Sequence, residues 1–403
     1  MRIAYIVPYV PNLIRTRPYN LINHLSRLGH EVVVFTLGSS RQDLIDAQTL
    51  RGKCKEVHYY SHPIWHSLLN SAAAFPSSKP LQSVYSWQRG IALQILKRVY
   101  SNEFDLVHVE HLRGSSYGAF LKSRFPAMPV VWDSVDCISH LFEQAASQSR
   151  SLFGKFVTRF ELARTQKSEG DLACKFDHVL ITSSSDRNAL LELIPEGKYV
   201  SPISVLTNGV DLDYFYPNPE IQRDAETIVF SGKMSFHANI SMARYLVAEI
   251  MPRIWKLRPA ARLYIVGKDP SGDIKRLAKN PLVTVTGTVR DIRPFLWRAT
   301  VAVVPLVYGA GIQNKILEAM ATGTPVVTTC KALSALQVQA GKHLFASNDP
   351  DEFSQAVLKL IGDQDLQHRI GSSGANYIQT YHNWASIASQ LEGIYHQVLG
   401  HST

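Results

Sequence analysis

Short apolar runs alternate with segments of helical periodicity from the first residues of the chain. Arg2–Val7 is a near-continuous apolar run, and Tyr19–Leu28 carries apolar residues at helical spacing. After a break at Gly29-His30, Glu31–Thr36 is a second apolar run. This order predicts a β-α-β unit. Strands that are apolar throughout suit a parallel sheet with helices on both faces.

The same alternation continues through the first half of the chain. Further buried strands are predicted at Leu106–Val109, Val130–Asp133 and Val179–Thr182. The segment Tyr60–Lys79 is less regular, and its prolines and serines favour a long surface excursion. Residues 1–205 are therefore predicted to form one doubly wound, Rossmann-like domain.

A linker is predicted over residues 206–226, where an Asn-Gly turn is followed by two prolines and a charged stretch. The alternation then restarts, with strand candidates at Thr227–Ser231, Arg262–Val266, Val283–Thr286, Ala302–Pro305, Pro325–Thr328 and His343–Ala346. Residues 227–380 are predicted to form a second doubly wound domain, and residues 381–403 a C-terminal helix that packs back on the first. The expected fold is α/β, with two Rossmann-like domains facing each other across a cleft that binds ligands.

Composition and charge narrow the class of protein. The 403 residues are 45% hydrophobic and 10% aromatic, which argues against a disordered or collagen-like chain. The formal net charge of +9 favours a polyanionic partner, which leaves nucleic acid, an anionic membrane and phosphorylated small molecules open.

The cysteines and the apolar runs indicate the cellular compartment in which the protein is expected. The four cysteines form no C-x-x-C pair, so neither a zinc site nor a disulfide framework is indicated. The apolar start is stopped by Pro8 and is typical of a strand rather than a signal peptide. No apolar stretch approaches the roughly 20 residues that span a bilayer. A cytoplasmic protein is expected.

The segment Pro305–Val327 carries the clearest candidate chemistry. A strand is followed by a loop with Gly309 and Gly311 and then by a mostly apolar helix. The amino terminus of a helix offers unpaired N–H groups and a positive dipole end, which suit a diphosphate. Lys315 and Glu318 lie three residues apart on one face of this helix. There a lysine can neutralise phosphate, and a carboxylate can accept hydrogen bonds from ribose hydroxyls. A solvent-exposed ion pair is the alternative.

Several motifs in order along the chain resemble the group 1 glycosyltransferases (family 4). They are Asn208-Gly-Val-Asp-x-x-x-Phe215, Ser231-Gly-Lys233, Ile265-Val-Gly267, Gly287-Thr-Val289 and Leu317-Glu-Ala-Met-Ala-x-Gly-x-Pro-Val-Val327. The resemblance implies the GT-B fold. The sequence Gly311-Ile-Gln-Asn-Lys315 is also similar to sugar transferases linked to bacterial exopolysaccharide clusters.

The resemblance implies a role for several residues of the second domain. Glu318 would hold the nucleotide ribose, and Lys233 and Lys315 would stabilise the leaving phosphate. The remaining implied donor-binding residues are Gly232, Thr288, Val289, Arg290, Gly311, Ile312, Gln313 and Asn314. Of these, Thr288–Arg290 would line the base and Gly311–Asn314 would offer backbone donors.

The chain departs from the family pattern at two places. A glutamate common in the family is replaced by Ala310, which bears on how the donor sugar is held. A second basic residue expected after Lys233 is missing, because residues 236–240 contain only His237. Lys315 is expected to supply the lost charge.

Candidates in the first domain are taken from the loops after its strands. The family's histidine that faces the reacting sugar corresponds first to His111, with Glu110 as the second choice; a structural histidine is the alternative. Arg15 and Arg17 are expected to meet an anionic acceptor or the diphosphate, unless they are surface residues at a helix start. Asp133, with Asp136, is expected to line the acceptor pocket or to cap the next helix.

Two further features are a D-x-D sequence and a basic amphipathic segment. Asp211-Leu-Asp213 spells a D-x-D sequence, but its position after the Asn-Gly turn favours structural hydrogen bonding, and no metal or other cofactor is expected. Arg150–Lys167 has the pattern of a basic amphipathic helix, which suits either an anionic bilayer surface or packing on the first domain.

The resemblance implies a glycosyltransferase that moves a sugar from a nucleoside-diphosphate donor to a glycan or lipid-linked acceptor with retention of configuration. The expected partners are this donor, this acceptor and an anionic membrane surface, with no nucleic acid. Two alternatives stay open, a nucleotide-sugar 2-epimerase of the same fold and a basic nucleic-acid-binding protein. The second lacks aromatic–basic interleaving and a recognition motif.

Overall fold

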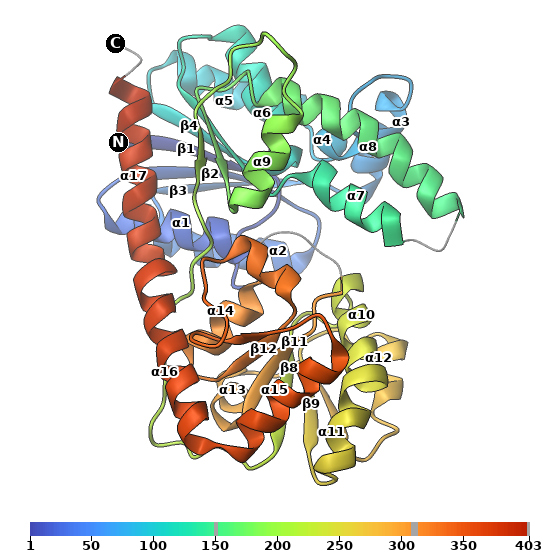
Figure 1. The fold of residues 1–403 in the computed structure, drawn as a ribbon. Helices are drawn as coiled ribbons and strands as arrows, with labels where there is room; N and C mark the ends of the chain where they lie inside the picture. Colours follow the sequence, from blue (N-terminus) through green and yellow to red (C-terminus); the bar gives the residue numbers. More distant parts are fainter. Residues whose placement is uncertain (149–151, 308–312, 401–403) are drawn as a thin grey trace. The chain divides into compact units, whose positions relative to one another are not determined.

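The structure is a computed structural model that describes residues 1–148, 152–307 and 313–400 (Figure 1). It divides into two compact units. Unit 1 comprises Met1–Asn208 together with Trp384–Thr403, and unit 2 comprises Gly209–Asn383. The chain therefore passes from one unit to the other twice.

Unit 1 is built on a parallel sheet with the strand order β3-β2-β1-β4-β5-β6-β7. The strands are β1 (Arg2–Val7), β2 (Glu31–Gly38), β3 (Glu56–Ser61), β4 (Leu106–Glu110), β5 (Val130–Val135), β6 (His178–Ile181) and β7 (Ile203–Val205). The central strands are buried along almost their whole length, as continuous apolar runs require.

Helices cover both faces of this sheet and create two apolar cores. They are α1 (Thr16–Arg27), α2 (Arg41–Leu50), α3 (Ile64–Ala74), α4 (Leu81–Tyr85), α5 (Arg89–Tyr100), α6 (His111–Arg124), α7 (Ile138–Gln148), α8 (Leu152–Leu172), α9 (Ser184–Glu192) and α17 (Trp384–Gly400). One core contains residues of α1 and α17, and the other contains residues of α5, α6, α8 and α9. Figure 1 shows α17 running beside α1. The α17 residues Ile387, Leu391 and Tyr395 are buried in the core that the two helices share.

Unit 2 repeats the same design with the strand order β10-β9-β8-β11-β12-β13, again all parallel. The strands are β8 (Thr227–Ser231), β9 (Arg262–Val266), β10 (Val283–Gly287), β11 (Val301–Val304), β12 (Val326–Thr328) and β13 (Phe345–Ala346). The α-helices are α10 (His237–Tyr245), α11 (Met251–Leu257), α12 (Gly272–Leu277), α13 (Arg293–Arg298), α14 (Asn314–Ala321), α15 (Pro350–Gly362) and α16 (Gln364–Tyr381).

The predicted fold class is confirmed, because both sheets have the doubly wound order in which the first strand lies at the centre and the chain winds outward in both directions. One local prediction is wrong. The segment predicted as an irregular excursion from Tyr60 to Lys79 contains the end of β3 and the helix α3. Its helix escaped notice because its apolar residues do not form a buried stripe.

Candidate functional site

The carboxyl ends of the strands of unit 2 meet at one edge of its sheet, where β8 and β9 approach each other very closely. Gly232 and Gly267 follow these strands with φ of +148° and +151°. A Cβ atom on Gly267 would lie 1.7 Å from the carbonyl oxygen of Gly232. Both positions therefore require glycine, which adopts this backbone without strain and leaves room for the neighbouring strand end.

Lys315, in the first turn of α14, is fixed at this edge by Asn239 of α10. Its Nζ donates a hydrogen bond of 2.5 Å to Asn239 Oδ1, and Asn239 Nδ2 donates one of 2.8 Å to the carbonyl oxygen of Lys233. Asn239 is only 5% exposed. A Cβ atom on Gly232 would lie 2.8 Å from Asn239 Nδ2, so the glycine makes space for this connection. Three segments distant in sequence thus place one ammonium group beside the end of β8.

The two charged residues of α14 are half-buried, and burial moves both pKa values toward neutrality. It lowers the pKa of Lys315 to about 8, while the attraction of Glu318 opposes the change. It raises the pKa of Glu318 to about 7, against the attraction of Lys315. Groups shifted in this way at a strand edge are typical of binding and catalytic sites. An anion bound here would restore the Lys315 pKa toward its ordinary value.

The other predicted residues of unit 2 are distributed around the same edge. Lys233 has an exposed side chain two residues after the end of β8, and Gln313 precedes α14, of which Asn314 is the first residue. Thr288 and Arg290 are exposed after β10, whereas Val289 packs partly on the core. Ala310, Gly311 and Ile312 lie outside the described residues.

Glu110 ends β4 in unit 1 and lies in a buried pocket formed by two tyrosines. Its carboxylate accepts hydrogen bonds from Tyr9 Oη at 2.6 Å and Tyr5 Oη at 3.4 Å. The side chain is fully buried, and this burial raises its pKa to about 8, with a smaller contribution from the nearby Asp133. Glu110 is therefore mostly protonated at neutral pH, and sequence reasoning did not identify Tyr9 as its partner.

His111 follows Glu110 with a backbone conformation that residues other than glycine seldom adopt. Its φ is 62°, and Val135 at the end of the adjacent strand β5 has a φ of 68°. Its carbonyl oxygen accepts a hydrogen bond of 3.4 Å from Trp132 Nε1. Burial lowers the pKa of His111 to about 4, so its imidazole is neutral at pH 7. Strained residues at neighbouring strand ends mark a candidate site.

Arg17 and Asp133 form a buried ion pair of 2.8 Å. Arg17 Nη1 also donates to the carbonyl oxygens of Leu206 and Thr207 and to Asn208 Oδ1, at the end of the first chain segment of unit 1. These contacts give Arg17 an internal structural role. Its Nη2 is buried without a hydrogen-bond partner among the described residues, and the acceptor contact expected of Arg17 and Asp133 stays a prediction.

His108 of β4 joins the same buried network. Its ring stacks on Tyr5 with centroids 4.1 Å apart, and its Nδ1 lies 2.7 Å from Tyr395 Oη of α17. Its Nε2 lies 3.8 Å from Asp133 Oδ2. Burial lowers the pKa of His108 to about 4. The network ties the C-terminal helix to the centre of the unit 1 sheet.

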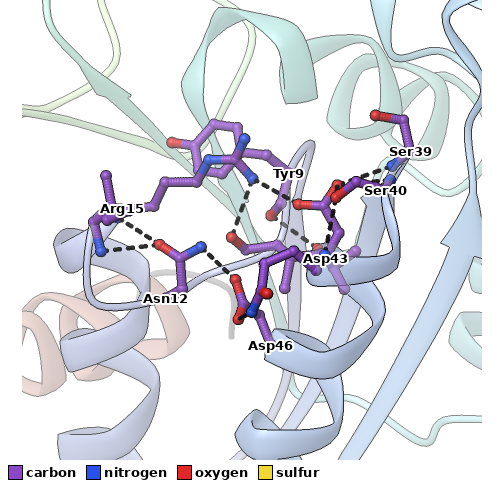
Figure 2. Close-up of polar contacts among 11 residues, drawn as sticks. Tyr9, Asn12, Arg15, Ser39, Ser40, Asp43 and Asp46 are labelled. Atoms are coloured by element: carbon purple, nitrogen blue, oxygen red, sulfur yellow. Dashed lines mark hydrogen bonds and ion pairs between the residues drawn. The ribbon is translucent and has the colours of Figure 1, made fainter. Parts of the chain in front are cut away.

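Arg15 is partly exposed in a glycine-free loop after β1 (Figure 2). Its guanidinium lies over the Tyr9 ring, donates to the carbonyl oxygen of Val10 and lies 3.7 Å from Asp43 Oδ1. Asn12 Oδ1 accepts a hydrogen bond from the backbone N–H of Arg15, and Asn12 Nδ2 donates a hydrogen bond of 2.7 Å to Asp46 Oδ2. The loop is therefore held by α2, and Arg15 remains accessible to an anion.

Two alternative structural roles are decided by hydrogen bonds. The amino terminus of α7 is capped by Glu169, which accepts the N–H groups of Ile138 and Ser139, so the cap expected of Asp133 or Asp136 comes from another residue. Asp136 is half-buried, and its removal from water raises its pKa to about 6, with a further contribution from Asp186. Asp211 Oδ1 accepts the N–H groups of Asp213 and Tyr214, which is the structural hydrogen bonding that its position predicts.

Residues 1–148, 152–307 and 313–400 contain neither a metal-binding cluster nor a membrane-spanning helix. No group of three or more His, Cys, Asp or Glu side chains in those ranges is arranged to hold a metal ion. Within the same ranges, no helix has the length and apolarity needed to cross a membrane. Of the segment Arg150–Lys167, Arg150 and Ser151 lie outside the described residues and residues 152–167 belong to α8.

Two protein-family models match successive parts of the chain. The model described as glycosyltransferase family 4 matches residues 15–214, and that described as glycosyl transferases group 1 matches residues 225–363. Among curated proteins, the chain is 23% identical to an MMP alpha-(1->4)-mannosyltransferase of Mycolicibacterium hassiacum, over 94% of each chain.

Solved structures show the same fold at low sequence identity. The Anabaena protein Alr3699/HepE in complex with UDP has a TM-score of 0.71 at 14% identity, covering 98% of this chain and 100% of that one. Sucrose-phosphate synthase from Thermosynechococcus elongatus has a TM-score of 0.70 at 17% identity, covering 99% of both chains. The fold of the two units is therefore GT-B.

Proposed function

The chain belongs to the glycosyltransferases of group 1, family 4, and on this premise we propose that its donor is a nucleoside-diphosphate sugar. The acceptor is a hydroxyl group of a glycan or of a lipid-linked glycan, in the synthesis of polysaccharide or glycoconjugates such as exopolysaccharide. The transfer retains the configuration at the anomeric carbon, as the family resemblance implies.

The observation that carries this proposal is the Lys315 ammonium fixed by Asn239 beside the end of β8. When the bond from the sugar to the diphosphate breaks, negative charge grows on the departing phosphate. A cation held in place before the reaction stabilises that charge without reorganisation. Lys233 is exposed two residues after the end of β8 and adds a second cation.

Glu318 accepts the ribose hydroxyls in this proposal. It lies one turn after Lys315 on the same helix face, so a nucleotide whose diphosphate meets Lys315 brings its ribose within reach of the carboxylate. Binding two hydroxyl donors favours the ionised carboxylate and lowers the Glu318 pKa from about 7. Because lysine cations meet the diphosphate charge, no metal cofactor is proposed, and EDTA is expected to leave nucleotide binding unchanged.

We assign the acceptor to the carboxyl edge of unit 1. Nδ1 of the neutral His111 imidazole accepts the backbone N–H of Arg113 at 3.3 Å, which leaves Nε2–H to donate a hydrogen bond to a sugar hydroxyl, and the strained backbone holds the ring at the end of β4. Arg15 is partly exposed above Tyr9 and is suited to an anionic group on the acceptor.

A thermal-shift screen with UDP, GDP, ADP and CMP tests the proposal, with UDP first because the similar Anabaena structure holds it. A nucleotide that binds the folded state raises the melting temperature by mass action. Glu318→Ala and Lys315→Met are expected to lose the shift. The matched control is Lys359→Met, which alters an exposed lysine of α15 and should keep the shift. A full shift in both site variants contradicts the assignment.

A further inference from the structure

The helix α3 presents an apolar surface to solvent. Its four large apolar residues are each between 56% and 61% exposed: Ile64, Trp65, Leu68 and Leu69. The other exposed residues of this helix are Ala72 and Ala73, so every exposed position of α3 is apolar. Spacings of one, four and five residues place the four large side chains on one face.

The buried side of α3 is polar or small, which inverts the usual arrangement. Ser67 is 1% exposed and its Oγ lies 2.9 Å from His62 Nε2. Asn70 Nδ2 donates a hydrogen bond of 2.9 Å to the carbonyl oxygen of Trp87. A surface helix normally buries its apolar stripe and exposes polar residues. Polar groups anchor α3 to unit 1, while its apolar face stays available.

The apolar surface continues past the end of α3 to α8. The exposed Phe75 packs against Phe160, with ring centroids 5.3 Å apart. Arg164 Nη2 donates to the carbonyl oxygen of Phe75 at 2.6 Å, and its guanidinium lies 3.9 Å from the centroid of the Phe160 ring. Figure 1 shows α3, α4 and α8 as neighbours in unit 1. Arg164 therefore fixes the end of the apolar face and adds a positive charge beside it.

The surroundings of this face are basic. The sequence from Val57 to Asn102 contains no aspartate or glutamate, and its Lys79 and Arg89 are exposed. Glu161 is the acidic residue beside Arg164, and its Oε2 accepts the N–H of Leu81. The cations Lys79, Arg89 and Arg164 around the apolar face complement a negatively charged surface.

We propose that α3 is a membrane-docking helix that lies in the headgroup region of an anionic bilayer. Trp65 and the two leucines enter the boundary between headgroups and acyl chains, and Lys79, Arg89 and Arg164 contact anionic headgroups. The exposed apolar face, which is costly in water, is covered by lipid in this arrangement. The inference does not depend on the proposed sugar transfer. It gives a peripheral enzyme a defined side that faces the membrane.

Vesicle flotation of the full chain tests this proposal, with phosphatidylcholine vesicles that contain or lack phosphatidylglycerol. Trp65 is a selective reporter because it is the one exposed tryptophan among the six of the chain, all of which lie in the described ranges. Anionic vesicles are expected to shift its emission to shorter wavelength, and Trp65→Phe should remove this shift. Added salt should weaken binding, since headgroup contacts are screened.

The variant Leu68→Ser/Leu69→Ser keeps the reporter and should reduce binding to anionic vesicles by about tenfold or more. Its matched control is Leu44→Ser/Ile45→Ser, which alters two adjacent, exposed apolar residues of α2 in the same unit and should bind normally. Lys79→Glu/Arg89→Glu should bind less, and most clearly at low salt. The proposal is overturned if the wild type does not float with anionic vesicles, or if both serine pairs reduce binding equally. It is also overturned if α3 instead mediates self-association that Leu68→Ser/Leu69→Ser abolishes while vesicle binding persists.

Discussion

The Lys315 ammonium donates a hydrogen bond of 2.5 Å to Asn239 Oδ1 across 76 residues of sequence. The Nδ2 group of the same amide donates a hydrogen bond to the carbonyl oxygen of Lys233. Asn239 therefore orients Lys315 without adding charge. A neutral acceptor is significant here, because a carboxylate at the same place would pair with the ammonium and compete with a bound phosphate.

Substitutions at Asn239 test this orienting role. Asn239→Leu should weaken UDP binding by roughly tenfold, since a lost hydrogen bond to a charged group costs about 1.5 kcal/mol or more. Asn239→Asp keeps an acceptor but should also weaken binding and raise the Lys315 pKa. Asn376→Asp introduces the same charge change at an exposed position of α16 and should bind like the wild type. Calorimetry gives the affinities, and unchanged binding in both Asn239 variants would refute the role.

Nucleotide binding at pH 8 should take up protons. Burial holds the Lys315 pKa at about 8, so about half of these side chains are neutral at that pH, and a bound diphosphate raises the pKa. The affinity for UDP should fall by up to about tenfold per pH unit above pH 8, because the cation is lost. Lys315→Arg keeps its charge and should show neither effect. Calorimetry in buffers of different ionisation enthalpy measures the uptake, and equal heats in all buffers would count against a titrating Lys315.

Gly267→Ala should lower the free energy of unfolding of unit 2 by roughly 2–4 kcal/mol. The reason is that the new Cβ atom would lie 1.7 Å from the carbonyl oxygen of Gly232. The residue also has a φ of +151°. Gly272→Ala is the control, since a Cβ atom there has nothing within 4 Å, and its effect should stay below about 1 kcal/mol. Urea unfolding monitors both, and similar midpoints would mean that β8 and β9 do not approach as described.

The buried Glu110 should make unit 1 less stable as pH rises from 6.5 to 8. Its pKa is raised from an ordinary value of 4.5 to about 8 on folding, so the folded state binds more protons than the unfolded state throughout this window. The loss is at most about 1.4 kcal/mol per pH unit. Glu110→Gln should not show it. His108 and His111 have pKa values lowered from 6.5 to about 4, so they add an opposing slope near pH 6.5 that is the same in both proteins, and the difference between the two slopes isolates Glu110. Equal slopes of unfolding free energy against pH in the two proteins would show that Glu110 is ionised in the folded state.

Much of the fold is visible in the sequence because continuous apolar strands alternate with amphipathic helices. Thr227–Ser231 and Arg262–Val266 are predicted with the bounds that β8 and β9 have. The strand Glu56–Ser61 is missed because it lies at the sheet edge and carries polar residues among its half-buried positions. The helix Ile64–Ala74 is missed because its apolar side faces solvent, which is the feature that suggests a docking surface.

The candidate site is only partly visible in the sequence for a different reason. Lys315 and Glu318 stand in a recognisable motif, whereas Asn239 is a polar residue in an ordinary helical segment. Its importance comes from two hydrogen bonds that only the folded chain brings together, one of them across 76 residues. Tyr9 and the strained backbone of His111 are likewise properties of the fold. The sequence does contain one relevant signal, the absence of a second basic residue after Lys233. This absence directs attention to Lys315 as the residue that replaces the missing charge.

The central claim is that Lys315 meets the diphosphate of the donor, and the reactivity of this lysine in the wild-type protein measures it directly. Reductive methylation followed by mass spectrometry reports each lysine separately, with and without saturating UDP. We expect UDP to protect Lys315 by about tenfold, with protection of Lys233 as well, while the exposed Lys359 reacts equally in both samples. Equal methylation of Lys315 with and without bound UDP would contradict the account.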